Sequence, residues 1–239
     1  MQEFEVVQDF VSASARVLSE DELVEAFDKA IQKLGFTHFS CASMMDYNNP
    51  VPGSIFITKL PESWTSRYLD KNYHQQDAVL DAVQNRNVPV IWENMHVRNR
   101  FQKKILKEAS ECGLKNGISV QLFVPGFIPT TFSVSSEEQD FDRDSYLLLH
   151  LLCVYFHEAV LRVREESGSP QFEKKELTGR EKECLYWAAS GKSDTDIADI
   201  LSISKHTVHF HIENAKRKFN LSTRIQTVVR AILSCSITP

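Results

Sequence analysis

Apolar residues recur at helical spacing in several stretches of the chain, and capping residues mark where these stretches begin and end. Ser19 and Glu22 have the spacing of a capping box, and Gly35 ends the stretch that they open. Pro61 begins another, at a position where a helix tolerates proline. In the first 166 residues, the stretches predicted to be helical are residues 4–18, 20–34, 61–73, 98–112 and 141–166.

Between these helices lie shorter segments rich in β-branched and aromatic residues, bounded by turn residues. The segments predicted to be strands are residues 36–47, 54–60, 89–92, 117–125 and 130–135. The last two flank the sequence PGFIP, which is typical of a hairpin turn. Since adjacent strands come in hairpin pairs and helices lie around them, the pattern predicts an antiparallel sheet covered by helices, an α/β sandwich.

The composition changes at residues 167–175, SGSPQFEKK, which read as a linker. After the linker every periodic stretch is helical. Thr178 and Glu181 form a second capping box, and the predicted helices are residues 178–191, 193–201, 204–219 and 222–234. Only Ser202 and Ile203 separate the second from the third. We therefore predict a sensor-like domain over residues 1–166 and an all-α four-helix domain over residues 176–239, with a helix-turn-helix.

The helix predicted over residues 204–219 has two different faces. Its apolar stripe consists of Val208, Ile212, Ala215 and Phe219, and Ser204 precedes it as a candidate N-cap. The other face offers side chains that can contact base edges or phosphates. They are Lys205, His206, His209, Glu213, Lys216, Arg217 and Lys218. Taken alone, this pattern is more often a solvated surface helix; the short turn before it favours a recognition helix.

The charge distribution adds modest support for a nucleic-acid partner. The chain has a net charge of −5, but residues 176–239 hold 9 Lys and Arg against 7 Asp and Glu, whereas the preceding residues hold 18 against 25. The C-terminal domain is thus the less acidic part, and its basic residues concentrate in one helix. The apolar content of 42% is that of an ordinary soluble globular protein.

Several protein classes are disfavoured. The five cysteines are far apart and contain no C-x-x-C pair, which fits reduced thiols in the cytoplasm. The N-terminus lacks a signal-peptide core, and the longest apolar run, residues 146–156, is below the ~20 residues of a membrane span. The eight histidines show no metal-ligand spacing, and no phosphate loop or nucleophile motif is present. We expect a cytoplasmic protein that is not an enzyme and has no metal or cofactor.

The C-terminal domain resembles the DNA-binding domain of LuxR-type regulators. The matching residues are Leu177, Thr178, Arg180, Glu181, Trp187, Gly191, Lys192, Ile197, Ala198, Leu201, Ile203, Thr207, Val208, His211, Asn214 and Lys218. Asp196 stands where the family usually has glutamate. The resemblance implies a homodimer on palindromic double-stranded DNA, with RNA polymerase as a further partner. It places His209 and Glu213 at base contacts, with Lys205 and His206 near the N-terminus of the same helix. Thr207 and Lys216 or Lys218 would hold phosphates.

The N-terminal domain resembles the acyl-homoserine-lactone sensor of quorum-sensing LuxR-type proteins. The matching residues are Trp64, Tyr68, Asp77, Pro89, Trp92, Gly113 and Gly117. The lactone has a ring carbonyl to which an indole N–H can donate, and an amide N–H from which a carboxylate can accept. Trp64 and Asp77 would fill these roles, within aromatic walls formed by Tyr68, Tyr73 and Trp92. The resemblance further places the Thr131 hydroxyl near the amide carbonyl.

Ordinary structural roles would account for some of the same residues. Trp64 and Tyr68, spaced four residues apart, can be core packing, and Asp77 can be a helix cap. Leu60 stands where many family members have a tyrosine that donates to the amide carbonyl, and Ala78 stands where proline is usual. An unpaired buried carbonyl costs roughly 1–3 kcal/mol. Because of these two departures, a different lactone and a ligand-independent or antagonist regulator both stay open as alternatives. An interaction protein without a DNA role is a further alternative.

The last predicted helix has an apolar seam of its own. Ile225, Val228, Val229 and Ile232 lie at helical spacing and form a candidate dimer face. Burial of the seam within the four-helix domain explains the same pattern equally well.

Overall fold

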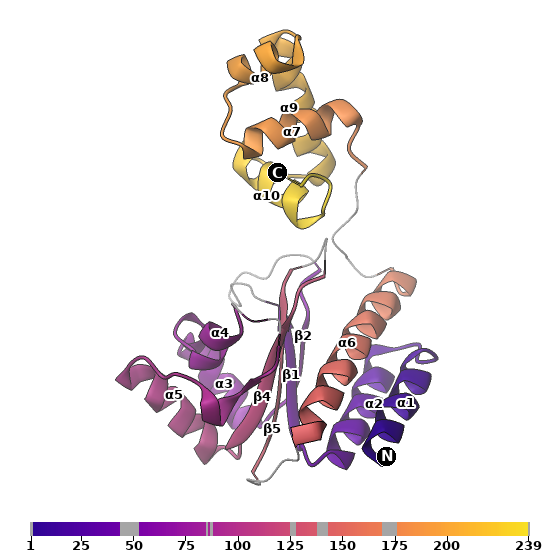
Figure 1. Ribbon diagram of the computed structural model, residues 1–239, viewed down its shortest axis with the longest axis vertical. Helices are drawn as coiled ribbons and strands as arrows, with labels where there is room; N and C mark the ends of the chain where they lie inside the picture. The colour runs from indigo at the N-terminus through magenta and orange to yellow at the C-terminus, as the bar shows by residue number, and fades with distance from the viewer. Residues whose placement is uncertain are drawn as a thin grey trace. The chain divides into compact units, whose positions relative to one another are not determined.

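A computed structural model describes residues 2–43, 53–84, 86, 88–124, 128–137, 143–168 and 176–238 (Figure 1). The main division between its two compact units falls between residues 171 and 172. We refer to them as the N-terminal unit and the C-terminal unit.

The N-terminal unit contains an antiparallel sheet in the described part of the chain. Its strands are β1 (His38–Ser43), β2 (Phe56–Lys59), β3 (Val90–Ile91), β4 (Asn116–Leu122) and β5 (Thr130–Ser136). The spatial order is β2-β1-β5-β4-β3, and every neighbouring pair is antiparallel. The central strand β5 places Ser133 directly opposite Ser40 of β1 on one side and Ser119 of β4 on the other.

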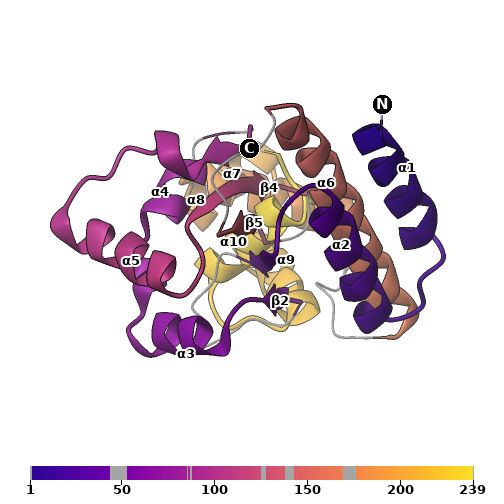
Figure 2. The same cartoon turned by 90° about the horizontal axis from the view of Figure 1, so that it is seen from below.

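Helices cover both faces of this sheet. One face carries α1 (Gln2–Ser14), α2 (Glu20–Lys33) and α6 (Arg143–Glu166), and the other carries α3 (Glu62–Asp70), α4 (Ala78–Val83) and α5 (Arg100–Glu111), as Figures 1 and 2 show. The predicted α/β sandwich is confirmed.

The two faces of the sheet differ because successive strand residues point to opposite sides. Phe39 and Phe132 point towards α2 and α6, where they pack around Phe27. The ring centroid of Phe27 lies 4.9 Å from that of Phe39 and 4.5 Å from that of Phe156 on α6. The alternate strand positions, with small and hydroxyl side chains, face α3–α5 instead. They are Ser40, Ala42, Thr131, Ser133 and Ser135.

Helix α6 is long and apolar enough over Tyr146–Glu166 to cross a membrane by length and composition alone. Its apolar face, however, is part of the sandwich core, where Leu152 and Phe156 are fully buried. The Arg164 guanidinium donates to both carboxylate oxygens of Glu20 on α2. The composition of α6 is therefore that of a core helix that also holds the first helices in place.

Several element boundaries differ from the predicted ones. Helix α1 ends at Ser14 instead of residue 18, because Arg162 of α6 donates to the carbonyl groups of Ser14 and Val17 and thereby satisfies the end of the helix. Three short elements were not predicted, because one or two turns are too short to show a periodicity. They are α4 and the single 3-10 turns Tyr73–Gln75 and Trp92–Asn94. Parts of the predicted strand 36–47, the PGFIP turn, residues 141–142 and most of the linker lie outside the described residues.

The C-terminal unit consists of α7 (Gly179–Ala189), α8 (Asp194–Leu201), α9 (Lys205–Phe219) and α10 (Arg224–Leu233). The capping box of Thr178 and Glu181 is confirmed. A second box pairs Ser193 with Asp196, whose Oδ2 accepts from the Ser193 backbone N–H at 2.9 Å. Aspartate therefore does the capping work at the position where the resembling family usually has glutamate.

The turn between α8 and α9 depends on Ser202, which adopts a left-handed conformation with φ of 52°. Ser204 then caps α9 by accepting from the Thr207 backbone N–H at 3.0 Å. The predicted apolar stripe of α9 is buried in the core of the unit, so the helix-turn-helix is confirmed.

Candidate ligand pocket and nucleic-acid interface

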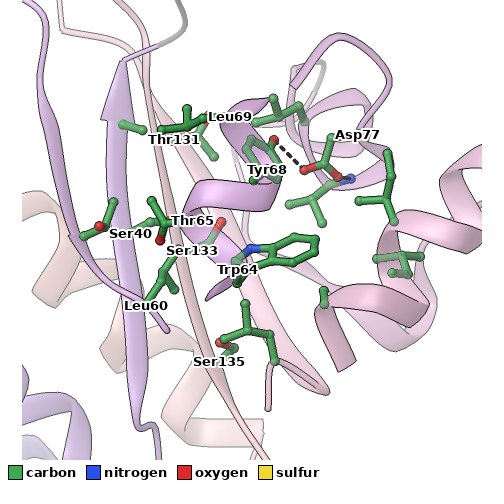
Figure 3. Close-up of a pocket in the computed structure, with 18 of the residues that line it drawn as sticks. Ser40, Leu60, Trp64, Thr65, Tyr68, Leu69, Asp77, Thr131, Ser133 and Ser135 are labelled. Carbon is green, nitrogen blue, oxygen red and sulfur yellow. Dashed lines mark hydrogen bonds between the residues drawn. The ribbon is translucent and has the colours of Figure 1, made fainter. Parts of the chain in front are cut away.

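A cavity lies between the hydroxyl-bearing face of the sheet and helices α3–α5 (Figure 3). Its volume is about 110 Å³. A single water needs only about 10–15 Å³ of such space, so the cavity has room for a larger guest. Its helical wall is mainly apolar and aromatic, whereas its sheet wall is lined by serines and threonines.

Trp64 and Tyr68 project from successive turns of α3 into this cavity. Their ring centroids are 5.6 Å apart, and the Trp64 side chain is buried. Within the described residues the Trp64 indole N–H makes no hydrogen bond, and Figure 3 shows its nitrogen on the side of the ring that faces the sheet. Trp64 therefore presents an available donor to a guest, and core packing alone does not account for it.

Asp77 lines the same cavity with a buried carboxylate. Its Oδ1 accepts from the Val79 backbone N–H at 2.8 Å and so caps α4, while its Oδ2 accepts from the Tyr68 hydroxyl at 2.8 Å. Burial raises the pKa of Asp77, and these two hydrogen bonds oppose the shift. The carboxylate is thus both a helix cap and a pocket residue, with acceptor capacity left for a guest.

The other predicted ligand residues are placed differently. Trp92 lines the cavity, but its indole N–H donates to Ser119 Oγ at 2.9 Å. Tyr73 is not among the lining residues: its hydroxyl donates to Glu108 at 2.9 Å, and its ring lies 6.1 Å from that of Trp64. Thr131 lines the cavity, and its buried hydroxyl oxygen has no hydrogen-bond partner among the described residues. Unpartnered buried hydroxyls are uncommon, so Thr131 marks a position for a polar ligand atom.

The sequence prediction missed the remaining hydroxyls of the sheet wall. Ser40, Thr58, Ser133 and Ser135 also line the cavity. The alternation in HFSCAS and TTFSVSS was a usable signal, because it places every second residue on one face. Leu60 lines the cavity as well, so the wall carries an alkyl group at the position where the resemblance led us to expect a tyrosine.

In the C-terminal unit, the face of α9 opposite its buried stripe is open to solvent. Lys205, His206 and His209 are exposed there, as predicted for a nucleic-acid interface. Phe210 is 53% exposed and was not predicted to take part. At 3.6 residues per turn it lies on the outward side, between His206 and Glu213. Its position opposite the apolar stripe was the signal that could have identified it.

Two of the predicted base-contacting residues have partners within the unit. His209 Nδ1 lies 3.7 Å from Asp194 Oδ2, and Asp194 also accepts from Arg224. Glu213 Oε1 accepts from Lys216 Nζ at 2.7 Å, and this hydrogen bond lowers the pKa of the Glu213 carboxyl. At neutral pH Glu213 is therefore an anion that can only accept hydrogen bonds.

Of the predicted phosphate-contacting residues, Thr207 bonds to the Ser204 hydroxyl at 2.8 Å. Lys218 Nζ donates to the buried Glu181 carboxylate at 2.8 Å and to the Glu176 carbonyl at 3.0 Å. Lys218 thereby ties α9 to the capping box of α7. In the described part of the chain no group of three or more His, Cys, Asp or Glu side chains could hold a metal ion.

Comparison with known proteins shows to which protein family the N-terminal and C-terminal units belong. The family model described as the autoinducer binding domain matches residues 19–160, and the model of bacterial regulatory proteins of the luxR family matches residues 175–231. The chain belongs to the LuxR family. It is an autoinducer-binding transcription regulator of the quorum-sensing type, as its resemblance predicted.

Its relatives span most of its length. The transcriptional activator protein LuxR of Aliivibrio fischeri is 34% identical over 189 residues, which are 76% of this chain and 74% of that protein. The transcriptional activator protein AnoR of Acinetobacter nosocomialis is 26% identical over 230 residues, 95% of this chain and 96% of that protein. A solved structure of SdiA in complex with octanoyl-rac-glycerol matches with a TM-score of 0.73 and 25% identity, covering 98% of this chain and 96% of that one.

Proposed function

We propose that this LuxR-family protein binds an N-acyl-homoserine lactone in the cavity between its sheet and α3–α5. The observation that carries the proposal is the pair of buried groups on one wall, the available indole donor of Trp64 and the carboxylate acceptor of Asp77. The lactone needs both: its ring carbonyl accepts, and its amide N–H donates. The hydroxyl of Thr131, which has no hydrogen-bond partner among the described residues, supplies a further polar contact.

The apolar part of the cavity fits the other half of such a ligand. Val79, Leu80 and Ile105 form its aliphatic wall, suited to an acyl chain. The structural relative SdiA supports this assignment, because its solved complex holds octanoyl-rac-glycerol, an acyl chain on an oxygen-rich head.

The test is thermal unfolding of the full chain with and without lactones of several acyl lengths. A ligand at 100 times its dissociation constant stabilises the folded state by about 2.7 kcal/mol, which is a readily measured shift. Asp77→Asn keeps an oxygen to cap α4 but loses the charged acceptor, so we expect a much smaller shift. Asp70→Asn, exposed at the end of α3, is the matched control. If no lactone shifted the wild-type transition, the lactone proposal would be wrong.

A ligand-independent or antagonist regulator is the second candidate, and Leu60 is the observation that favours it. Leu60 lines the cavity without a polar group, at the position where the family resemblance leads us to expect a tyrosine that donates to the amide carbonyl. Transcription from a target promoter with no lactone added separates the two candidates. Equal reporter activity with and without lactones favours the second, and lactone-dependent activity favours the first.

For the C-terminal unit we propose that α9 enters the major groove of palindromic DNA, with one helix from each subunit of a homodimer. The exposed residues Lys205, His206 and His209 and the half-buried Glu213 would contact base edges, and a glutamate would accept from a cytosine amino group. His209→Ala and Glu213→Ala should each weaken specific binding by about 1–3 kcal/mol and relax the preference at one base pair. Lys182→Ala, exposed on α7, is the control. Unchanged preference in both variants would contradict the assignment.

The support for a dimer is an apolar strip on α10. Ile225, Val229 and Ile232 are 76%, 49% and 38% exposed at spacings of four and three residues, whereas Val228 packs against the core of the unit. Ile225→Glu should therefore abolish dimers on DNA without changing the unfolding temperature. The control Gln226→Glu should leave both the dimers and the unfolding temperature unchanged. Sedimentation of protein–DNA complexes measures this, and dimers of the Ile225 variant would refute the assignment.

The remaining parts of the proposal follow from the relatives. They are transcriptional activators, so we propose that this regulator acts in the cytoplasm, activates transcription and contacts RNA polymerase.

A further inference from the structure

Helix α9, which the structure describes in full, keeps one large apolar side chain in solvent, that of Phe210. The other apolar residues of the helix, Val208, Ile212, Ala215 and Phe219, are buried, whereas Phe210 is 53% exposed. Successive residues of a helix are about 100° apart, which puts Phe210 within roughly 10° of the direction opposite the centre of the buried stripe. The helix therefore directs this ring straight away from the core of the C-terminal unit.

The side chains around Phe210 leave its ring uncovered. Helical side chains lean towards the N-terminus of their helix, so Glu213 and Asn214, three and four residues further on, are placed to cover it. Both are instead bonded towards the C-terminal end of the helix. Lys216 donates to Glu213 Oε1 at 2.7 Å, and Arg217 donates to Asn214 Oδ1. The ring is thus open to solvent in the middle of a polar face.

The base edges in the major groove offer such a ring only one suitable partner. They present hydrogen-bond donors and acceptors, and thymine alone adds an apolar group, its C5-methyl. A phenyl ring placed on donors and acceptors takes water away from them without replacing the lost hydrogen bonds, which is unfavourable. Placed on a thymine methyl, the ring buries apolar surface on both partners, which is favourable.

We propose that Phe210 packs on the C5-methyl group of a thymine in each half-site and makes the protein selective for thymine at that position. This inference rests on the proposed binding of α9 in the major groove, and it adds an apolar contact to the polar ones. Glu213 lies one turn further along the helix, an axial distance of about 4.5 Å, which is close to the ~3.4 Å between base pairs. The thymine then belongs to a base pair adjacent to the one that Glu213 contacts.

The experiment removes the methyl group and nothing else. A preferred operator is first selected from a randomised palindromic DNA library by the full-length protein, in the presence and in the absence of N-octanoyl-homoserine lactone. Each thymine of one half-site is then replaced by deoxyuridine, which keeps every hydrogen-bonding group but lacks the methyl. Burial of one methyl-sized group corresponds to roughly a fourfold change in affinity. We expect one of these replacements to weaken wild-type binding by about this factor.

Variants test whether Phe210 is the residue that reads the methyl group. Phe210→Ala should bind the thymine and deoxyuridine operators equally, while Phe210→Leu, which keeps an apolar contact, should retain most of the difference. Neither should change the salt dependence of binding, because the proposed contact involves no phosphate. Tyr186→Ala removes a ring that is 37% exposed on α7, and as the matched control it should keep the full difference. Unfolding temperatures of the free variants show whether each is folded.

The outcomes separate this inference from the function on which it rests. If every thymine of a selected half-site could be replaced without loss of wild-type affinity, the inference would be wrong and major-groove binding by α9 would stand. The same conclusion would follow from a selected half-site without thymine. A methyl dependence that persisted in Phe210→Ala would also overturn the inference. If no operator were selected at all, both would fail together.

Discussion

The ion pair between Lys218 and Glu181 gives the sharpest prediction, because it separates a structural lysine from one that contacts DNA. The Glu181 side chain is 4% exposed and the Lys218 side chain 34% exposed. Replacing Lys218 with methionine keeps the aliphatic stem but leaves the carboxylate with the hydrogen bond that it accepts from the Thr178 backbone N–H. The family resemblance assigned a phosphate contact to Lys216 or Lys218, whereas the contacts of Lys218 predict a role in stability.

The size of the effect follows from burial. A hydrogen bond to a charged group contributes about 1.5–3 kcal/mol, and we reduce this to about 1–2 kcal/mol because Lys218 is one-third exposed and water can partly replace it. In a domain of 60–100 residues, each kcal/mol corresponds to about 4–8 °C. Lys218→Met should therefore lower the unfolding temperature of the C-terminal unit by roughly 5–15 °C.

The same pair predicts a pH dependence. Although burial alone would raise the pKa of Glu181, the hydrogen bonds from Lys218 and Thr178 lower it. The stabilisation is then complete above the unfolded-state pKa of about 4.3 and is lost as pH falls through the lower folded-state value. The difference between wild type and Lys218→Met should shrink accordingly in acid.

Calorimetry of the full chain measures these changes, with Lys216→Met as the matched control. Lys216 pairs with Glu213, whose side chain is 38% exposed, so its loss should cost less than about 1 kcal/mol. Equal small effects of the two substitutions would refute the structural assignment of Lys218. So would a Lys218 variant with unchanged stability and weakened DNA binding.

Two further predictions concern the N-terminal unit. His157 is buried, and neither of its ring nitrogens has a hydrogen-bond partner in the described part of the chain. Burial lowers the pKa of His157 to about 4, so the stability should fall as pH drops from about 6.5 towards 4. In His157→Leu, urea unfolding should show this loss reduced; an unchanged pH profile would contradict it. Gly117→Ala would place its Cβ 2.6 Å from the Val134 carbonyl oxygen and 2.8 Å from the Trp92 ring. We expect a cost of about 1–3 kcal/mol and altered Trp92 fluorescence, and wild-type stability would exclude the clash.

The sequence by itself determined the types of the longer helices and strands and the helix-turn-helix. Helical and alternating periodicities are local properties, and caps such as Thr178 with Glu181 act within one turn, so they can be read without knowing the fold. The two faces of the sheet were also encoded locally, because alternate residues in TTFSVSS point to opposite sides. Trp64, Tyr68, Asp77, Trp92 and Thr131 were selected by resemblance, and the structure places all five at one cavity.

Only the tertiary structure decided how these side chains are used. The register of four strands places Thr58, Ser40, Ser133 and Ser119 in one row across the sheet. Ser40 and Ser133 are 93 residues apart in the sequence, and no local pattern connects them. The same holds for Lys218: a basic residue near a helix end has the same local signature whether it faces DNA or Glu181. Which partner it meets depends on the packing of α7 against α9, a long-range contact that local spacing does not specify.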